Sequence, residues 1–220
     1  MRTKLTLFSL FFCLTIFAQK VKVACIGNSI TFGYTIENRD KDSYPAQLQA
    51  LLGDGYDVQN YGNCGKTAQN DADDPYTKCP EYQQAKDFLP QIAVIKLGTN
   101  DSKPVNWDTH SSEYSADMQK MIDTLNALPS KPMIFLCTPI AGNHQAGDNP
   151  QNQCRDKVIR DEVIPQILKV AKKNKLQVID LYPVVSLNGE EMQKDMLHPT
   201  AAGAHKIAQS VAKAISSSGR

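Results

Sequence analysis

Short apolar, β-rich runs alternate with amphipathic stretches along most of this chain, and this alternation constrains the fold more than any other feature. The runs with the composition of strands are Val21 to Ile26, Asp57 to Tyr61, Ile92 to Leu97, Met133 to Cys137 and Gln177 to Leu181. Their nearly continuous apolar character is typical of strands covered on both faces, as in a parallel sheet.

The segments between these runs have the periodicity of helices. The segments are Ser43 to Leu52, Ser111 to Leu128, about Cys154 to Asn174, and about Thr200 to Ile215. Pro45 fits a first helical turn, and Pro165 predicts a kink in the third segment. Strand–helix alternation of this kind predicts one domain over residues 19–220. We expect a three-layer α/β/α sandwich with a central, mainly five-stranded parallel sheet, as in flavodoxin-like folds.

The first 18 residues have a different composition from the rest. A basic start with Arg2 and Lys4 precedes the apolar run Leu5 to Phe17, and a small residue, Ala18, follows. These are the parts of a secretory signal peptide, so we expect removal of residues 1–18 and a secreted or periplasmic protein. The run is shorter than the roughly 20 residues that cross a bilayer, which predicts no stable membrane insertion after cleavage. An uncleaved anchor is the alternative.

Five cysteines remain after the expected cleavage, and an odd number in an oxidising compartment indicates two disulfides and one free thiol. Cys25 lies within an apolar run and is the natural buried free thiol. Possible disulfides are Cys64–Cys79 and Cys137–Cys154, each closing a short loop. The connectivity stays open, and five buried thiols are the alternative.

Charge and short motifs predict neither a nucleic-acid partner nor a cofactor. Lys and Arg number 24 against 23 Asp and Glu, so no basic surplus indicates nucleic-acid binding. The stretch Gly65-Lys66-Thr67 lacks the glycine that a phosphate-binding loop needs where Asn60 stands. The acidic stretch 71–74 lacks the glycine and distal glutamate of a calcium loop. We therefore expect no metal site.

Polar residues of catalytic type stand where the predicted strands end. Ser29 follows the first strand and Asn100 the third, Gly62 stands at the end of the second, and Asp195 precedes His198 by three residues. A serine hydroxyl needs a base to take its proton, and that base needs an orienting partner. A developing oxyanion needs hydrogen-bond donors, which Gly62, Asn100 and the Ser29 N–H can supply.

These residues resemble the four sequence blocks of the SGNH, or GDSL-like, hydrolases. The blocks in this chain are Gly27-Asn28-Ser29-Ile30, Asn60-Tyr61-Gly62, Gly98-Thr99-Asn100-Asp101 and Asp195-Met196-Leu197-His198. The resemblance implies that Ser29 is the nucleophile, that Asp195 and His198 complete a triad, and that Ser29, Gly62 and Asn100 form the oxyanion hole. One departure is Asn28, where aspartate is usual, which we interpret as a local hydrogen-bonding substitution.

The resemblance implies acyl transfer on an ester, with no cofactor. Export and the short chain favour a carbohydrate esterase that removes small acyl groups, acetyl above all, from a small-molecule or polysaccharide substrate. A lipid-directed lipase, lysophospholipase or thioesterase is the second interpretation. A non-catalytic glycan-binding protein on the same fold is a third, of another class.

Overall fold

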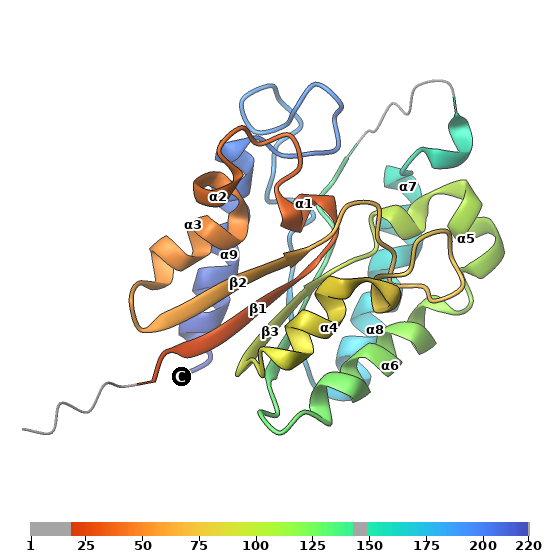
Figure 1. Cartoon of the computed structure of the whole chain (residues 1–220). Coiled ribbons are helices and arrows are strands. Elements are labelled where there is room, and N and C mark those ends of the chain that lie inside the picture. Colours follow the sequence, from red (N-terminus) through yellow and green to blue (C-terminus); the bar gives the residue numbers. More distant parts are fainter. Residues whose placement is uncertain (1–18, 143–148, 220) are drawn as a thin grey trace, which may run out of the picture.

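The structure is a computed structural model that describes residues 19–142 and 149–219 (Figure 1). The expected signal peptide, residues 1–18, lies outside the described residues. One all-parallel sheet has the strand order β2-β1-β3-β4-β5. The strands are β1 (Val21–Gly27), β2 (Tyr56–Gly62), β3 (Ile92–Lys96), β4 (Met133–Cys137) and β5 (Gln177–Ile179). The predicted strands are therefore confirmed, with ends that shift by at most two residues.

Helices connect the strands. They are α1 (Ser29–Phe32), α2 (Arg39–Asp42), α3 (Tyr44–Leu52), α4 (Pro80–Asp87), α5 (Pro104–His110), α6 (Tyr114–Asn126), α7 (Asp156–Val158), α8 (Ile164–Asn174) and α9 (Ala201–Ser217). The expected helices correspond to α3, α6, α7 with α8, and α9. The apolar pattern of the sequence does not predict α1, α2, α4 and α5, because such short helices contain too few turns to show a periodic apolar face.

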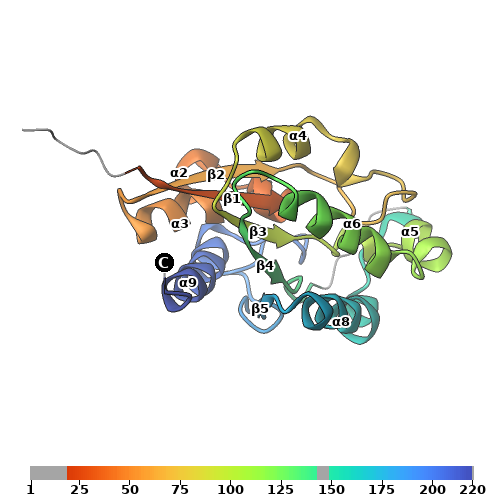
Figure 2. The same ribbon diagram turned by 90° about the horizontal axis from the view of Figure 1, so that it is seen from below.

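The helices cover both faces of the sheet, with α3 and α9 on one side and α4, α6 and α8 on the other (Figures 1 and 2). Each face has its own apolar core. Alternate residues of β3 divide between the two cores: Ala93 and Ile95 face α6, and Ile92 and Val94 face α9. A strand buried on both faces must be apolar at consecutive positions, which explains the continuous runs. The predicted α/β/α sandwich is confirmed.

The helical segment around Pro165 is interrupted by a π-helical turn rather than by a simple kink. Helix α7 runs into the π turn Ile159–Val163, and Pro165 then lies in the first turn of α8. A proline has no N–H to donate to the preceding turn, so the regular hydrogen-bond ladder cannot continue through it. The widened turn comes immediately before the proline.

The two expected disulfides are absent, because all five cysteines of the described residues are free thiols. Cys137 packs in the core on the α9 side, whereas the Cys154 Sγ lies 3.9 Å from the Asn100 Oδ1, near the end of β3. Cys79 packs in the core on the α4 side, and Cys64 is only half-buried. Each expected pair is thus close in sequence but lies in two different environments. The expected buried thiol at Cys25 is confirmed.

Candidate active site

The carboxyl ends of the central strands lie at one level and bring their loops together. Gly27 of β1 pairs in register with Gly62 of β2 on one side and with Lys96 of β3 on the other. In an open parallel sheet, the loops at this edge form the ligand site. Residues from the loops after β1, β2 and β3 therefore meet here.

Ser29 is the first residue of the short helix α1, which begins directly after β1. The Asn28 side chain caps this helix, since its Oδ1 accepts a hydrogen bond from the Ile30 N–H at 3.1 Å. Asn28 is fully buried, so the cap is shielded from water. Asparagine caps helices about as well as aspartate. The departure at residue 28 therefore keeps the hydrogen bond that holds Ser29 at the strand end.

Asp195 and His198 share one tight turn ahead of α9. One carboxylate oxygen, Oδ1, accepts the backbone N–H groups of Leu197 and His198, each at 3.0 Å. The other oxygen, Oδ2, lies 2.6 Å from the His198 Nδ1. Met196, between them, has a left-handed φ of +56°, so the backbone reverses tightly enough for both side chains to point the same way. The three-residue spacing thus orients the imidazole locally.

The protonation of this pair follows from its hydrogen bonds. Burial raises the pKa of Asp195, but the His198 and Leu197 N–H groups and the imidazole outweigh it, so the pKa lies below its usual range. An ionised carboxylate can only accept hydrogen bonds, so the His198 Nδ1 is the donor. In the neutral imidazole the Nε2 is then the acceptor, and it lies 2.8 Å from the Ser29 Oγ. The structure brings the three predicted triad residues into one hydrogen-bonded chain.

A cavity of about 210 Å³ opens beside the Ser29 hydroxyl. Ser29 and His198 line it together with residues from the neighbouring loops: Tyr34, Cys64, Gly65, Asn100, Lys103, Asn152, Cys154 and Leu197. The cavity is therefore small, and its lining mixes polar and apolar groups.

Asn100 lies in this cavity with its side-chain amide already oriented. Its Nδ2 donates a hydrogen bond to the Lys66 carbonyl at 3.1 Å, and its backbone carbonyl accepts the Asn106 side-chain amide at 3.0 Å. An amide nitrogen carries two hydrogens, so the second one is available to a ligand oxygen. This arrangement suits the expected oxyanion donor.

Gly62 does not occupy the place expected for an oxyanion donor. Its N–H donates to the Asn60 Oδ1 at 2.9 Å, and Gly62 lines a different cavity. A Cβ at residue 62 would collide with the Phe32 backbone of α1, so glycine is needed there for close packing. Gly65, three residues later, lines the Ser29 cavity with a φ of +81°. The cavity beside Ser29 is thus lined by Gly65 and not by the expected Gly62.

Asp101 joins the loop after β2 to the loop after β3. Its Oδ1 accepts the backbone N–H groups of Ala68 and Gln69 at 2.8 and 3.0 Å. Complete burial raises the pKa of Asp101 to about 7, although the Gln69 and Ala68 N–H groups lower it. The carboxyl group therefore fixes the loop that contains Gly65 relative to the loop that contains Asn100.

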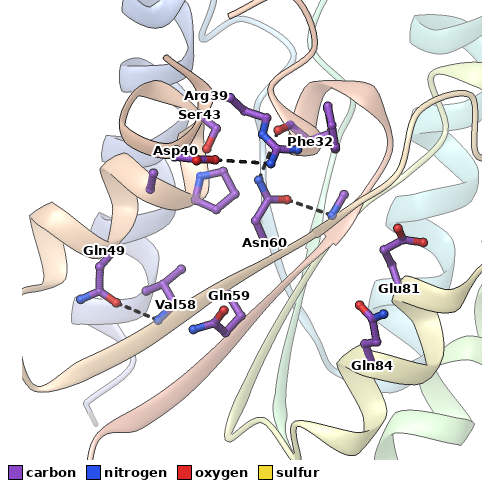
Figure 3. A pocket seen from close by; sticks show the side chains of 13 residues that line it. Phe32, Arg39, Asp40, Ser43, Gln49, Val58, Gln59, Asn60, Glu81 and Gln84 are labelled. Atoms are coloured by element: carbon purple, nitrogen blue, oxygen red, sulfur yellow. Dashed lines mark hydrogen bonds and ion pairs between the residues drawn. The ribbon is translucent and has the colours of Figure 1, made fainter. Parts of the chain in front are cut away.

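A second cavity, of about 440 Å³, lies along the outer edge of β2 between α2, α3 and α4 (Figure 3). Its walls carry amide and charged side chains, among them Arg39, Gln49, Gln59, Glu81 and Gln84. Figure 3 shows the Gln49 side chain bonded to the Val58 backbone, so this side chain satisfies part of the exposed strand edge, and it shows Asn60 turned toward Phe32 of α1. Neither serine–histidine pairing nor any imidazole occurs in its lining.

No group of three or more His, Cys, Asp or Glu side chains among the described residues could hold a metal ion. None of the helices described is both long enough and apolar enough to cross a membrane.

Comparison with known proteins adds to this geometry. Residues 25–206 match the GDSL-like lipase/acylhydrolase family, a range that contains all four sequence blocks. The chain belongs to this family. It is 43% identical to an acetylxylan esterase of Xylanibacter ruminicola over 89% of its own length. The match covers 43% of that relative, so the chain spans less than half of its length.

Solved structures of other proteins show the same fold at low sequence identity. An aryl esterase from Mycobacterium smegmatis has a TM-score of 0.72 at 18% identity, with 90% of this chain and 99% of that chain covered. A carbohydrate acetylesterase from Sinorhizobium meliloti gives the same TM-score, identity and coverage. The agreement over nearly the full length of both proteins confirms the architecture of this GDSL-like chain.

Several side chains of the cavity beside Ser29 could not be predicted from the sequence. Tyr34, Lys103 and Asn152 lie in connecting segments, and the spacing of Cys64 and Cys154 favours disulfides instead. The stretch from Asn60 to Thr67 contains two glycines, and the second of them, Gly65, was the only indication in the sequence that a glycine other than Gly62 could line the cavity. Its spacing alone could not show which of the two glycines faces Ser29.

Proposed function

We propose that this chain is a serine esterase that removes acetyl groups from carbohydrate. The observation that carries the proposal is the hydrogen-bonded chain from Ser29 through His198 to Asp195 beside a small cavity. The similarity to an acetylxylan esterase supports an acetylated polysaccharide as the substrate class.

In the proposed reaction, the Ser29 Oγ attacks the ester carbonyl while the His198 Nε2 takes the hydroxyl proton. The resulting oxyanion accepts hydrogen bonds from the Asn100 amide and from the Gly65 and Ser29 N–H groups. The C–O bond to the sugar then breaks, and the sugar oxygen takes the proton from Nε2. A water molecule, deprotonated by Nε2, attacks the acetyl-enzyme, and the collapse returns the proton to Ser29 and releases acetate.

The volume of the cavity favours a short acyl group. Ligand pockets for larger molecules usually measure about 300–1,000 Å³, whereas this cavity measures about 210 Å³. A long acyl chain would leave most of its apolar surface in water. The lipid-directed interpretation is therefore the weaker one.

We also propose that the protein is exported and processed after Ala18. The basic start and the 13-residue apolar run from Leu5 to Phe17 support this. N-terminal sequencing of protein recovered from the periplasm or medium tests it. A first residue of Gln19 is expected, and an intact Met1 would contradict processing.

Acetate release from acetylated xylan tests the activity, with Ser29→Ala as the inactive control. A series of p-nitrophenyl esters from acetate to decanoate tests the acyl length, and we expect activity to fall steadily with chain length. Preference for long chains would overturn the carbohydrate assignment. Failure of an organophosphonate to label Ser29 would instead support the non-catalytic, glycan-binding interpretation.

A further inference from the structure

Tyr34 places an exposed aromatic ring at the mouth of the catalytic cavity. The residue is 48% exposed and lines the cavity beside Ser29. Its ring centroid lies 4.9 Å from that of His198, with the two rings inclined at 58°. Part of the tyrosine ring thus covers the catalytic imidazole, and the rest faces solvent next to the nucleophile.

The backbone around Tyr34 fixes this position. Gly33 ends α1 with a φ of +87°, and Thr35 has a φ of +66°. The Tyr34 N–H donates a hydrogen bond to the Ser29 carbonyl at 3.0 Å. A left-handed conformation at a β-branched residue is costly and persists only where the surroundings enforce it. The chain therefore turns sharply and holds the tyrosine over the residue that begins α1.

Polar side chains from other elements complete the lining near Tyr34. Lys103 precedes α5, and its Nζ lies 3.6 Å from the Asp73 carboxylate. Asn152 ends the short turn Pro150–Asn152 and is exposed. An aromatic ring together with an ammonium and an amide group is suited to a sugar ring, which has an apolar C–H face and a rim of hydroxyl groups. Aromatic rings supply rigid apolar surface at little entropic cost.

We propose that Tyr34 is the platform of a pyranose-binding subsite on the leaving-group side of the cavity. The sugar that carries the acetyl ester packs its C–H face on the exposed part of the Tyr34 ring, and its hydroxyls bond to Asn152 and Lys103. This inference rests on the proposed carbohydrate esterase activity. It assigns recognition of the sugar to Tyr34, separately from recognition of the acyl group by the interior of the cavity.

Two substrates distinguish an effect on sugar binding from an effect on ester cleavage. They are acetylated xylo-oligosaccharides and ethyl acetate, whose leaving group has no ring. We expect Tyr34→Leu to lower kcat/KM for the sugar ester about three- to tenfold more than for ethyl acetate, mainly through KM. Leucine keeps apolar cover over His198 but lacks a ring face. Tyr34→Phe, which keeps the ring, is expected to retain the wild-type ratio.

Gln84→Ala is the matched control, because Gln84 is also exposed but lines the larger cavity along β2. We expect it to leave both substrates unaffected. Equal losses on both substrates in Tyr34→Leu would overturn the subsite, since Tyr34 would then act only through His198. A raised KM for the sugar ester in Gln84→Ala alone would place the sugar in the larger cavity and also overturn it.

Different results would refute the Tyr34 subsite and the carbohydrate esterase activity. If the wild type hydrolyses ethyl acetate but releases no acetate from any acetylated sugar, the carbohydrate esterase activity is wrong and the subsite is lost with it. If the wild type deacetylates the sugar and Tyr34→Leu does so with the same KM, only the subsite is wrong.

Discussion

The contacts of Asp195 make its replacement by asparagine a sharp test of the proposed mechanism. Two backbone N–H groups, those of Leu197 and His198, hold the Oδ1 at 3.0 Å. In Asp195→Asn, the amide oxygen must stay with these donors, because turning the amide would point its N–H groups at them. The amide nitrogen then faces the His198 Nδ1, 2.6 Å away in the wild type.

The size of the effect follows from this forced orientation. An amide nitrogen facing Nδ1 donates a hydrogen bond, so Nδ1 becomes an acceptor and the imidazole proton moves to Nε2. Nε2 can then no longer accept the Ser29 proton. The wrong tautomer in a triad of this type lowers kcat by roughly ten-thousandfold, which corresponds to about 5 kcal/mol of activation free energy.

The assay compares kcat for p-nitrophenyl acetate and the melting temperature of Asp195→Asn with those of Asp87→Asn. The control changes an exposed carboxylate, which accepts a hydrogen bond from Gln83 one turn earlier in α4 and does not line either of the two cavities described. Both variants should melt within a few degrees of the wild type, and only Asp195→Asn should lose activity. A kcat within tenfold of the wild type in correctly folded Asp195→Asn would refute the reasoning.

Three other substitutions have expected outcomes. Asn100→Ala should lower kcat about 100- to 1,000-fold through loss of an oxyanion donor, with an unchanged circular dichroism spectrum; an unchanged rate would reject that role. Gly62→Ala should lower the melting temperature sharply, because the new Cβ meets the Phe32 backbone; normal stability with reduced kcat would instead support a role for Gly62 in the oxyanion hole. In the unfolded state the Asp101 carboxyl loses its proton near pH 4. In the folded state its raised pKa, about 7, keeps the proton bound over the range between. The contribution of Asp101 to the free energy of unfolding should therefore fall between about pH 4 and 7, and thermal melts should show a smaller loss over this range in Asp101→Asn than in the wild type.

The candidate site could be predicted well where its geometry is local. Asp195 and His198 lie in one turn, so their spacing already indicated that the carboxylate orients the imidazole. Ser29 directly follows an apolar run, and a residue in that place must lie at the carboxyl edge of a parallel sheet. The role of Gly62 could not be predicted in this way. Gly62 ends β2 and Gly65 lies in the loop that follows, and only the tertiary packing shows that the first fills a tight contact with α1 while the second lines the cavity.

The cysteines also show that spacing along the chain does not determine which side chains meet in the fold. Spacing along the chain made Cys137 and Cys154 a plausible pair, but a short loop does not bring two side chains to the same face of a sheet. Cys137 points into the core at the end of β4, and Cys154 lies beside Asn100 in the catalytic cavity. A disulfide requires Cα atoms within about 7 Å and converging Cβ atoms, and those are properties of the folded chain.

The amino-acid sequence by itself determined the strand–helix alternation, the parallel sheet and the order of the catalytic blocks, because apolar periodicity and turn chemistry act over a few residues. The tertiary structure decided which groups meet across long separations. It placed the Ser29 hydroxyl 2.8 Å from an imidazole 169 residues away, turned Gly65 rather than Gly62 toward the cavity, and laid the Tyr34 ring against His198. Such meetings depend on how buried strands align and how loops pack at their ends, and no local pattern encodes that alignment.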